Sequence, residues 1–336
     1  MQQKVEALAD FSLIDPISPR VAVAQVKRFL RRPEDRIHLH DFFLAETERV
    51  VTGLQKVFSS VSNIVLNQTS GLEHLRKCEA EMSTLLPAFI CAARWGDSDV
   101  FDLLAGVVKR IGDNYTPENG YEASLRLRRY PALLLLYGAG LAASAGRNYG
   151  LLSSLFRLRI KPDLYSPETS ITELHNPFKM WSLVMQRQLI EGRQTKHTPL
   201  NDHVFDVLNK VIREYISSPH VYDQTFDWFE YLLGLIYCDQ TFAMPLPFGN
   251  NQEGIPIRYG PPGRFFCKSQ RSDEAIDRRM HLGPPGEPLP AEVEAAFASG
   301  LCRTPNATFD AKRYEELKAG FDSFLGMLRS QLGLYF

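Results

Sequence analysis

The chain of 336 residues carries 38 basic and 39 acidic residues, a formal net charge of −1 and an apolar share of 44%. A single hydrophobic core usually serves roughly 100 to 200 residues, so we expect one elongated domain or two compact ones. The balanced charge argues against a whole-protein field that attracts nucleic acid or anionic lipid, and leaves only local patches open.

The N-terminus and the cysteines indicate a cytoplasmic protein. The stretch MQQKVEALADFSLID contains acidic residues and no sustained apolar run, so we expect no secretory signal. The cysteines are odd in number, widely scattered and without a C-x-x-C spacing, which is typical of reduced thiols. They are Cys78, Cys91, Cys238, Cys267 and Cys302.

The first elements are helical. Residues 20–32 form an amphipathic segment that stops at Pro33, and residues 34–58 continue as a long helix. We expect the two to pair as a helical hairpin.

The next helix is predicted to begin at a cap on Thr69 or Ser70, to bend at Pro87 and to end near Trp95.

The most apolar stretch is RRYPALLLLYGAGLAASAGR, residues 128–147, which allows three interpretations. Its uncharged run of 16 residues, from Pro131 to Gly146, is shorter than the roughly 20 that a membrane span needs. Its Gly-Ala-Gly lies inside the apolar run and opens no helix, which disfavours a nucleotide loop. We therefore predict a central buried helix whose small residues let other helices approach closely.

Two turns suggest a weak internal repeat. Gly96-Asp97-Ser98 joins one helix to the next, and Gly146-Arg147-Asn148 does so 50 residues later. Two loosely matching copies are fewer than the three expected of a true solenoid, so we describe the arrangement as solenoid-like.

The downstream pattern is helical to about residue 240 and then rich in Pro and Gly. We expect helices over 177–190, 202–216 and 221–238, a loop over 244–264, and two C-terminal helices over 291–299 and 310–332.

Together these elements predict an all-α fold of stacked helical hairpins, either solenoid-like or an irregular bundle. We divide the chain into an N-terminal hairpin (1–65), a central helical domain (66–240) and a loop-rich C-terminal segment with two helices (241–336).

Few residues have the pattern of a reaction centre. His38 and His40 differ by two positions and cannot share one ion on a helix, so we predict no metal site and no cofactor. His203 lies three residues before Asp206, but one helical turn of exposed polar residues explains the spacing better than an acid–base pair does. Cys267 is a lone thiol beside cations. These observations favour a non-enzymatic protein and leave an enzyme with an inter-helix pocket as the alternative.

The charge pattern offers a candidate binding surface. From residue 126 to residue 161 the sequence carries seven cations and no acid, which fits either helix capping and solubility or a groove for a polyanion such as nucleic acid. The neutral net charge favours the first interpretation. The candidate binding residues of this basic flank are Arg126, Arg128, Arg129, Arg157, Arg159 and Lys161.

The loop RYGPPGRFFCK is a second candidate for recognition. The GPPG turn fixes the backbone, and Arg264, Phe265 and Phe266 are residue types that are enriched where partners bind tightly. Packing of both rings onto the helices, with Arg264 capping a carbonyl, is the equal alternative.

Three stretches carry a family resemblance: YPALLLLYGAGLAASAGR, FDWFEYLLGLIYCD and YGPPGRFFCK. They resemble a helical C-terminal region of bacterial multidomain proteins, where it follows a Toll/interleukin-receptor, sirtuin-like or Schlafen-like effector domain. The resemblance implies bacterial, and specifically antiviral, immunity. We accordingly expect a non-catalytic sensor or adaptor with a protein partner, with nucleic acid as an alternative partner and no membrane.

Overall fold

The computed structural model describes residues 17–59, 67–113, 127–161, 168–172, 190–192, 198–242 and Arg264. Within these residues the fold is all-α, as predicted, with one antiparallel pair of two-residue strands. The elements are α2 (Pro19–Leu30), η2 (Pro33–Asp35), α3 (Arg36–Ser59), α4 (Gln68–Glu81), α5 (Leu85–Trp95), α6 (Ser98–Gly112), α8 (Tyr130–Gly146), α9 (Tyr149–Phe156), β1 (Arg159–Ile160), β2 (Thr169–Ser170), α12 (Pro199–Ile212) and α13 (Pro219–Phe242).

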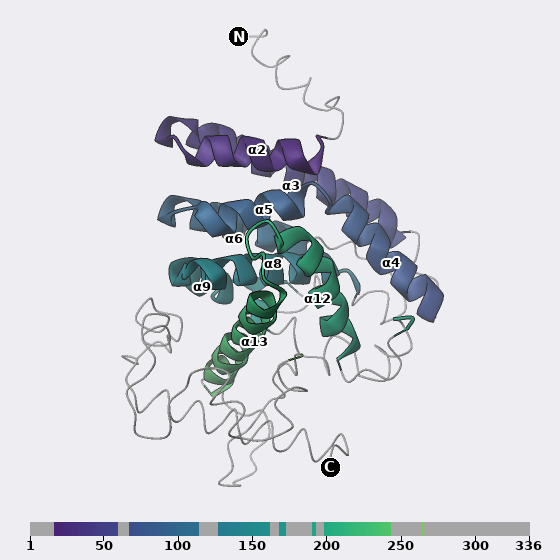
Figure 1. Cartoon of the computed structure of the whole chain (residues 1–336). Helices are drawn as coiled ribbons and strands as arrows, with labels where there is room; N and C mark the ends of the chain where they lie inside the picture. Colours follow the sequence, from purple (N-terminus) through teal and green to yellow (C-terminus); the bar gives the residue numbers. More distant parts are fainter. Residues whose placement is uncertain are drawn as a thin grey trace, which may run out of the picture.

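Three helical hairpins lie in successive tiers (Figure 1). Helix α5 packs against both α2 and α8, and α6 packs against both α3 and α9, so the hairpins α2–α3, α5–α6 and α8–α9 form a double layer. The two turns singled out in the sequence join α5 to α6 and α8 to α9. The solenoid-like arrangement is therefore confirmed, and α2–α3 supplies the third hairpin that the sequence echo lacked.

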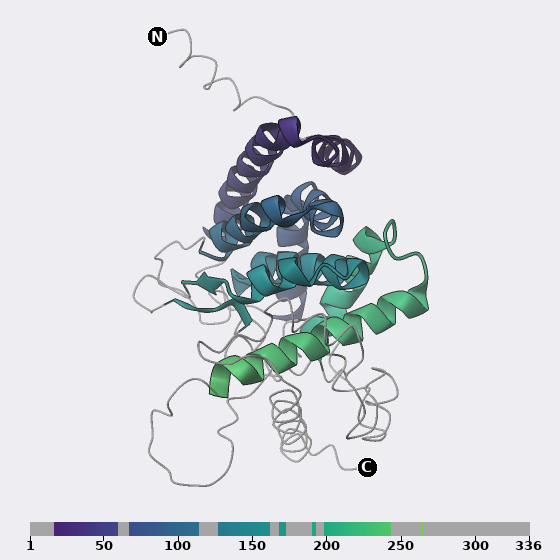
Figure 2. The same cartoon turned by 90° about the vertical axis from the view of Figure 1, so that its left-hand side faces the viewer.

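The remaining helices cover the third tier. Helices α12 and α13 both pack on α8, and Figure 2 shows α13 running beneath that tier. Helix α4 packs against α3 and α8. One continuous cluster of buried side chains runs through these elements from Ala22 to Ile236, so the hairpin α2–α3 shares its core with the central helices.

Helix α8 is the centre of this core. Every residue from Tyr130 to Ser144 is buried, which confirms the buried-helix interpretation. A Cβ at Gly138 would lie 3.0 Å from Ile90 of α5, and one at Gly140 would lie 2.0 Å from the Phe229 ring of α13. The glycines thus let two neighbours approach. No helix among the described residues is long and apolar enough to cross a membrane.

The end of α8 is tied to the tier above it. The sequence predicts that the helix ends at Gly146, and α8 ends there. The next residue, Arg147, adopts the left-handed backbone conformation, with φ 55°. The backbone N–H of Asn148 donates to the Ala143 carbonyl at 2.8 Å, which closes the helix end. The Asn148 side-chain amide donates to the Gly96 carbonyl at 3.2 Å. This bond joins the two corresponding turns of adjacent hairpins.

One predicted helix is wrong. The single helix expected to bend at Pro87 is two helices, α4 and α5, separated by residues 82–84. Pro87 lies in the first turn of α5, where its missing N–H would have no intrahelical partner, so it causes no bend. The cap of α4 is Asn67, which forms a reciprocal capping box with Ser70.

The ends of α12 and α13 also differ from the sequence expectation. Helix α12 covers Pro199–Ile212 and α13 covers Pro219–Phe242, so α12 begins and ends earlier, while α13 extends further at both ends. The helices expected over 177–190, 291–299 and 310–332 lie outside the described residues, as does the loop over 244–264 apart from Arg264.

Candidate ligand-binding pocket

The basic flank does not form one surface in the described residues. Arg128 is only 7% exposed, and its guanidinium lies over the Phe58 ring at 5.8 Å from the ring centre. Arg157, on the exposed surface after α9, donates its Nε–H to the Ser153 carbonyl at 3.0 Å. A buried arginine cannot reach a phosphate in solution. Arg129 is partly buried beside Arg128, and Arg126 lies outside the described residues.

The fold brings acids to the other end of this flank. Lys109 of α6 lies 2.9 Å from Asp113 and 3.0 Å from Glu168, and the Arg159 guanidinium donates to the Glu168 carbonyl. Asp113 also accepts the backbone N–H of Lys161 at 2.7 Å. These carboxylates lie outside the stretch from 126 to 161, so the sequence count of seven cations and no acid did not include them.

Arg264 lies against the first turns of α12 and α13. Its Nε is 2.9 Å from the Asp202 carboxylate, and its guanidinium lies over the Phe205 ring at 3.4 Å from the ring centre. Its side chain is 19% exposed. This geometry is that of a clasp within the chain. Phe265 and Phe266 lie outside the described residues, so recognition by this loop stays a prediction.

Within the described residues, His38 and His40 of α3 belong to no group of three potential metal ligands. His38 and His40 are exposed, and the nearest carboxylate to His40, that of Asp41, is 3.9 Å away. In the described part of the chain no three His, Cys, Asp or Glu side chains are grouped to hold a metal ion.

His74 on α4 is buried, and neither of its ring nitrogens has a hydrogen-bond partner among the described residues. Burial lowers its pKa to about 4, and the nearby cations Lys77 and Arg128 act in the same direction.

His203 has a carboxylate partner, but it is not Asp206. Its Nε2 lies 2.7 Å from Oε1 of Glu79, a residue 124 positions away on α4. The Tyr130 hydroxyl donates to the same oxygen at 2.8 Å. Burial, and then the Glu79 carboxylate, raise the pKa of Tyr130 well above its usual value. The cluster joins α4, α8 and α12.

Two turns further along α8, a second cluster repeats this arrangement. The Tyr137 hydroxyl donates to Glu230 of α13 at 3.1 Å, and the Asn201 amide donates to Tyr137 at 2.8 Å and to Glu230 at 2.9 Å. Glu230 is 4% exposed. Burial and the Glu230 carboxylate raise the pKa of Tyr137 well above its usual value. These polar groups are hydrogen-bonded to one another inside the core. We therefore interpret both groups as buried hydrogen-bond clusters that hold the neighbouring helices against α8.

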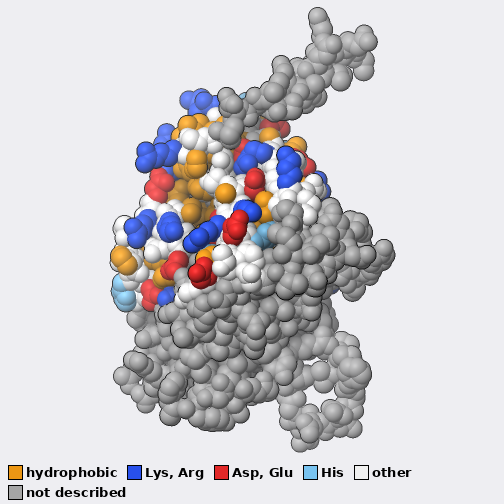
Figure 3. All heavy atoms as spheres, turned by 90° about the vertical axis from the view of Figure 1, so that its right-hand side faces the viewer, with side chains coloured by type: hydrophobic (Ala, Val, Ile, Leu, Met, Phe, Trp, Pro, Cys, Tyr) orange, Lys and Arg blue, Asp and Glu red, His pale blue; other side chains and the backbone are white. Residues whose placement is uncertain are grey.

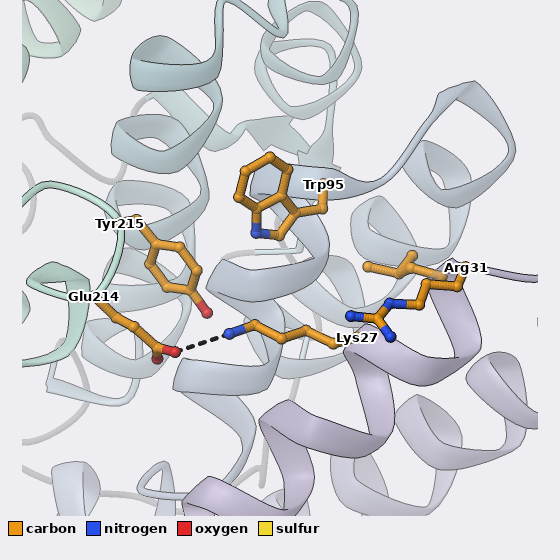
Figure 4. Close-up of a pocket in the computed structure, with 6 residues that line it drawn as sticks. Lys27, Arg31, Trp95, Glu214 and Tyr215 are labelled. Atoms are coloured by element: carbon orange, nitrogen blue, oxygen red, sulfur yellow. Dashed lines mark hydrogen bonds and ion pairs between the residues drawn. The ribbon is translucent and has the colours of Figure 1, made fainter.

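A pocket of about 480 Å³ opens where the first two tiers meet the turn between α12 and α13. Its lining residues come from three places in the chain: Lys27, Leu30 and Arg31 of the α2 end, Trp95 of the α5 end, and Glu214 and Tyr215 after α12. Figure 4 shows the nitrogen edge of the Trp95 indole and the two cationic side chains bordering one open space.

The local sequence explains why these side chains meet. Helix α2 closes with the Arg31 N–H donating to the Arg28 carbonyl at 3.2 Å, and Pro33 then begins the short helix η2. Helix α5 ends at Trp95 because Gly96 is extended. Helix α12 ends in a turn in which the Tyr215 N–H donates to Ile212 at 2.8 Å. All three contributions are therefore helix ends, where side chains can face an opening.

The pocket is electrostatically asymmetric. Lys27 is paired with Glu214 at 2.8 Å, and its ammonium lies 5.7 Å from the centre of the Tyr215 ring. Arg31 is exposed and makes no ion pair within the described residues. The Arg94 guanidinium lies over the Trp95 indole at 4.7 Å from the ring centre. The pocket therefore combines an excess of positive charge with an aromatic wall.

Behind the pocket the surroundings are apolar. Tyr215 is half-buried, and burial raises its pKa far above the usual value, with neighbouring Cys91 acting in the same direction. Burial also raises the pKa of the Cys91 thiol. Neither group ionises near neutral pH, so neither is an activated nucleophile or base. The neutral Tyr215 phenol therefore adds an uncharged aromatic wall to the pocket.

Two local features of the sequence indicate this pocket. Residues 20–32 hold five cations and no acid: Arg20, Lys27, Arg28, Arg31 and Arg32. Trp95 directly precedes a Gly-Asp-Ser turn and is 59% exposed in the structure, which is unusual for so large an apolar side chain. On the face that Figure 3 shows, positive and negative side chains are mixed among the described residues.

Comparison with known proteins identifies no relative: no family model matches the chain, and no curated protein or solved structure is significantly similar to it. The function must therefore be inferred from the chemistry of the site.

Proposed function

We propose that this protein is a non-catalytic sensor that binds a small ligand in the pocket formed by α2, the end of α5 and the turn after α12. The observation that carries the proposal is the strongly exposed indole of Trp95 beside Arg31, a cation without an ion pair among the described residues, at a pocket of about 480 Å³. Ligand pockets usually enclose about 300 to 1,000 Å³ and combine aromatic walls with a few polar groups.

The position of the pocket suits a sensor. The Lys27–Glu214 ion pair connects residues 187 positions apart, so α2 and the α12–α13 turn are in contact only through tertiary structure. A ligand that contacts both, and Trp95 between them, binds best when these elements are correctly placed. Binding therefore favours one arrangement of α12 and α13 over others.

The α12–α13 pair offers a route for the signal. Arg264, from the C-terminal third of the chain, lies 2.9 Å from Asp202 of α12 and 3.7 Å from Asp223 of α13. A shift of these helices would change the Arg264 contacts. This supports a role in which the pocket controls the C-terminal segment and any partner protein that binds there.

The resemblance to helical regions of bacterial defence proteins suggests what that partner is. On this proposal the output is an effector, and the chain works in the cytoplasm, which the free and buried Cys78 and Cys91 support. An effector gene next to this gene, and its product co-purifying with the wild-type chain, are the expected observations. Loss of that co-purification in an Arg264→Ala variant with an unchanged melting temperature would support the route through Arg264.

The sensor proposal is tested with a heat-treated, deproteinised cell extract that is separated by size. We expect the small-molecule fraction to raise the melting temperature of the wild-type protein, because a ligand that binds only the folded state stabilises it. Trp95→Ala should abolish the increase. Ile37→Ala, which removes another exposed apolar side chain outside the pocket, should keep it. An equal increase in Trp95→Ala, or none in the wild-type protein, would overturn the proposal.

A further inference from the structure

We infer that the ligand of this pocket is a purine nucleotide, an inference that rests on the proposed function and names its ligand class. The pocket places an exposed indole, a cation that makes no ion pair within the described residues and a carboxylate around one space. A purine nucleotide is a small molecule that combines a large planar ring, an anionic phosphate and N–H donors.

The face of the Trp95 indole that Arg94 does not cover is the surface for the base. Trp95 is 59% exposed at the edge of the pocket, although tryptophan normally buries most of its area. Stacking of a base on an aromatic side chain contributes about 1 to 3 kcal/mol and is strongest for large rings. The Tyr215 ring, which also lines the pocket, offers a second aromatic contact.

The end of α2 is the surface for the phosphate. Arg31 borders the pocket, is exposed and has no ion pair in the described part of the chain. The planar guanidinium can donate two parallel hydrogen bonds to phosphate oxygens. Arg28 and Arg32 are exposed beside it, and no acid lies between residues 20 and 32, so the local field attracts an anion.

Glu214 provides the contact for the base edge. Its Oε1 is paired with Lys27 at 2.8 Å, and its other oxygen has no hydrogen-bond partner among the described residues. A carboxylate oxygen accepts hydrogen bonds and donates none at neutral pH, so it selects a ring that presents N–H groups. The same carboxylate would repel a run of phosphates, which favours a mononucleotide over a nucleic-acid strand.

Isothermal titration calorimetry of the full chain with GMP and AMP tests this inference, with guanosine, inorganic phosphate and an acidic peptide as comparison ligands. We expect at least one nucleotide to bind about tenfold or more tightly than guanosine or phosphate, because each of these lacks one half of the recognised groups. Arg31→Ala should weaken nucleotide binding about tenfold or more, because it removes charge-assisted hydrogen bonds.

Two matched comparisons make the result specific. Arg20→Ala removes the same charge from the other end of the same helix, outside the pocket, and should bind like wild type. Trp95→Phe should retain most of the affinity that Trp95→Ala loses, because a smaller ring still stacks. The three side chains Arg20, Arg31 and Trp95 are exposed, so the variants should fold, and their melting temperatures check this.

Each outcome decides the inference. Absence of nucleotide binding overturns it, and so does binding that neither Arg31→Ala nor Trp95→Ala weakens. If the acidic peptide binds, the nucleotides do not, and Trp95→Ala weakens the peptide, the ligand class is wrong while the pocket remains a binding site. If the extract fraction stabilises Trp95→Ala as well as wild type, the proposed function fails first.

Discussion

The packing of α13 on α8 predicts opposite effects for the same substitution at two helical glycines. In Gly140→Ala the new Cβ would lie 2.0, 2.4 and 2.6 Å from three atoms of the Phe229 ring. That ring cannot move freely, because it meets the Tyr137 ring edge-on at 5.0 Å and stacks on the Phe156 ring at 6.0 Å. Gly106 of α6 is exposed and a Cβ there meets nothing within 4 Å.

The magnitudes follow from two opposing terms. Replacing glycine by alanine inside a helix stabilises by roughly 0.5 to 1 kcal/mol, which is the whole effect expected for Gly106→Ala. Gly140→Ala gains the same helix-propensity term but overpacks the core. Overpacking typically costs about 1 to 3 kcal/mol of stability, and the close contacts with Phe229 place its cost near the upper limit here. We expect Gly140→Ala to be destabilised by about 1 to 2 kcal/mol.

Urea unfolding followed by far-ultraviolet circular dichroism measures both variants against the wild-type protein. The loss of unfolding free energy caused by Phe229→Leu should be smaller in the Gly140→Ala background than in the wild-type background. The reason is that the smaller leucine side chain makes room for the new methyl group. If Gly140→Ala is as stable as Gly106→Ala, the close approach of α13 to α8 is not present and the description of the core is incorrect.

Three further substitutions test the core and its titrating groups. Leu135→Asp places an unpaired carboxylate in a fully buried position and should unfold or aggregate the protein. Leu44→Asp, at a side chain that is 54% exposed, should change the unfolding free energy by less than about 0.5 kcal/mol. A soluble Leu135→Asp protein with an unchanged melting temperature would refute the assignment of Leu135 to the core. Glu79→Ala removes the acceptor of the buried Tyr130 hydroxyl and should lower the free energy of unfolding by about 1 to 3 kcal/mol. Glu73→Ala, on the exposed side of α4, should lower it far less. Equal losses would show that the hydrogen-bond cluster around Glu79 contributes nothing to stability. The pKa of His74 is about 4 in the folded protein and 6.5 in the unfolded chain, so between these pH values the unfolded chain binds one proton more and stability falls as the pH falls from about 6.5 to 4. His74→Phe should flatten this part of the curve of unfolding free energy against pH. An unchanged curve would count against the burial of His74.

The elements whose signal is local could be predicted from the sequence. Helix α8 was identified because an apolar run bounded by Arg129 and Arg147 is too short for a membrane and apolar all round. The repeat of hairpins was visible in two turns because each turn is a few adjacent residues. The boundary between α4 and α5 was missed because Pro87 is compatible with both a bend and a helix start.

The pocket depends on contacts that the sequence does not reveal. Lys27 and Glu214 are 187 residues apart, and neither has a motif that points to the other. The same reason explains why His203 was compared with nearby Asp206 and not with distant Glu79. Residue types could indicate that α2 is basic and that Trp95 ends a helix, but only the stacking of the hairpins places these two features at one opening.

A ligand site formed by Trp95 and the α2 cations can be detected by Trp95 fluorescence in the variant Trp181→Phe/Trp228→Phe, where Trp95 is the single remaining tryptophan. The free protein should show the long-wavelength emission of a solvent-exposed indole, and the small-molecule fraction or its purified ligand should change it saturably. Arg31→Ala in the same background should require more ligand for half of the change, and Arg20→Ala should not. A short-wavelength emission in the free protein, or a ligand that stabilises the protein without changing Trp95 fluorescence, would contradict this assignment of the site.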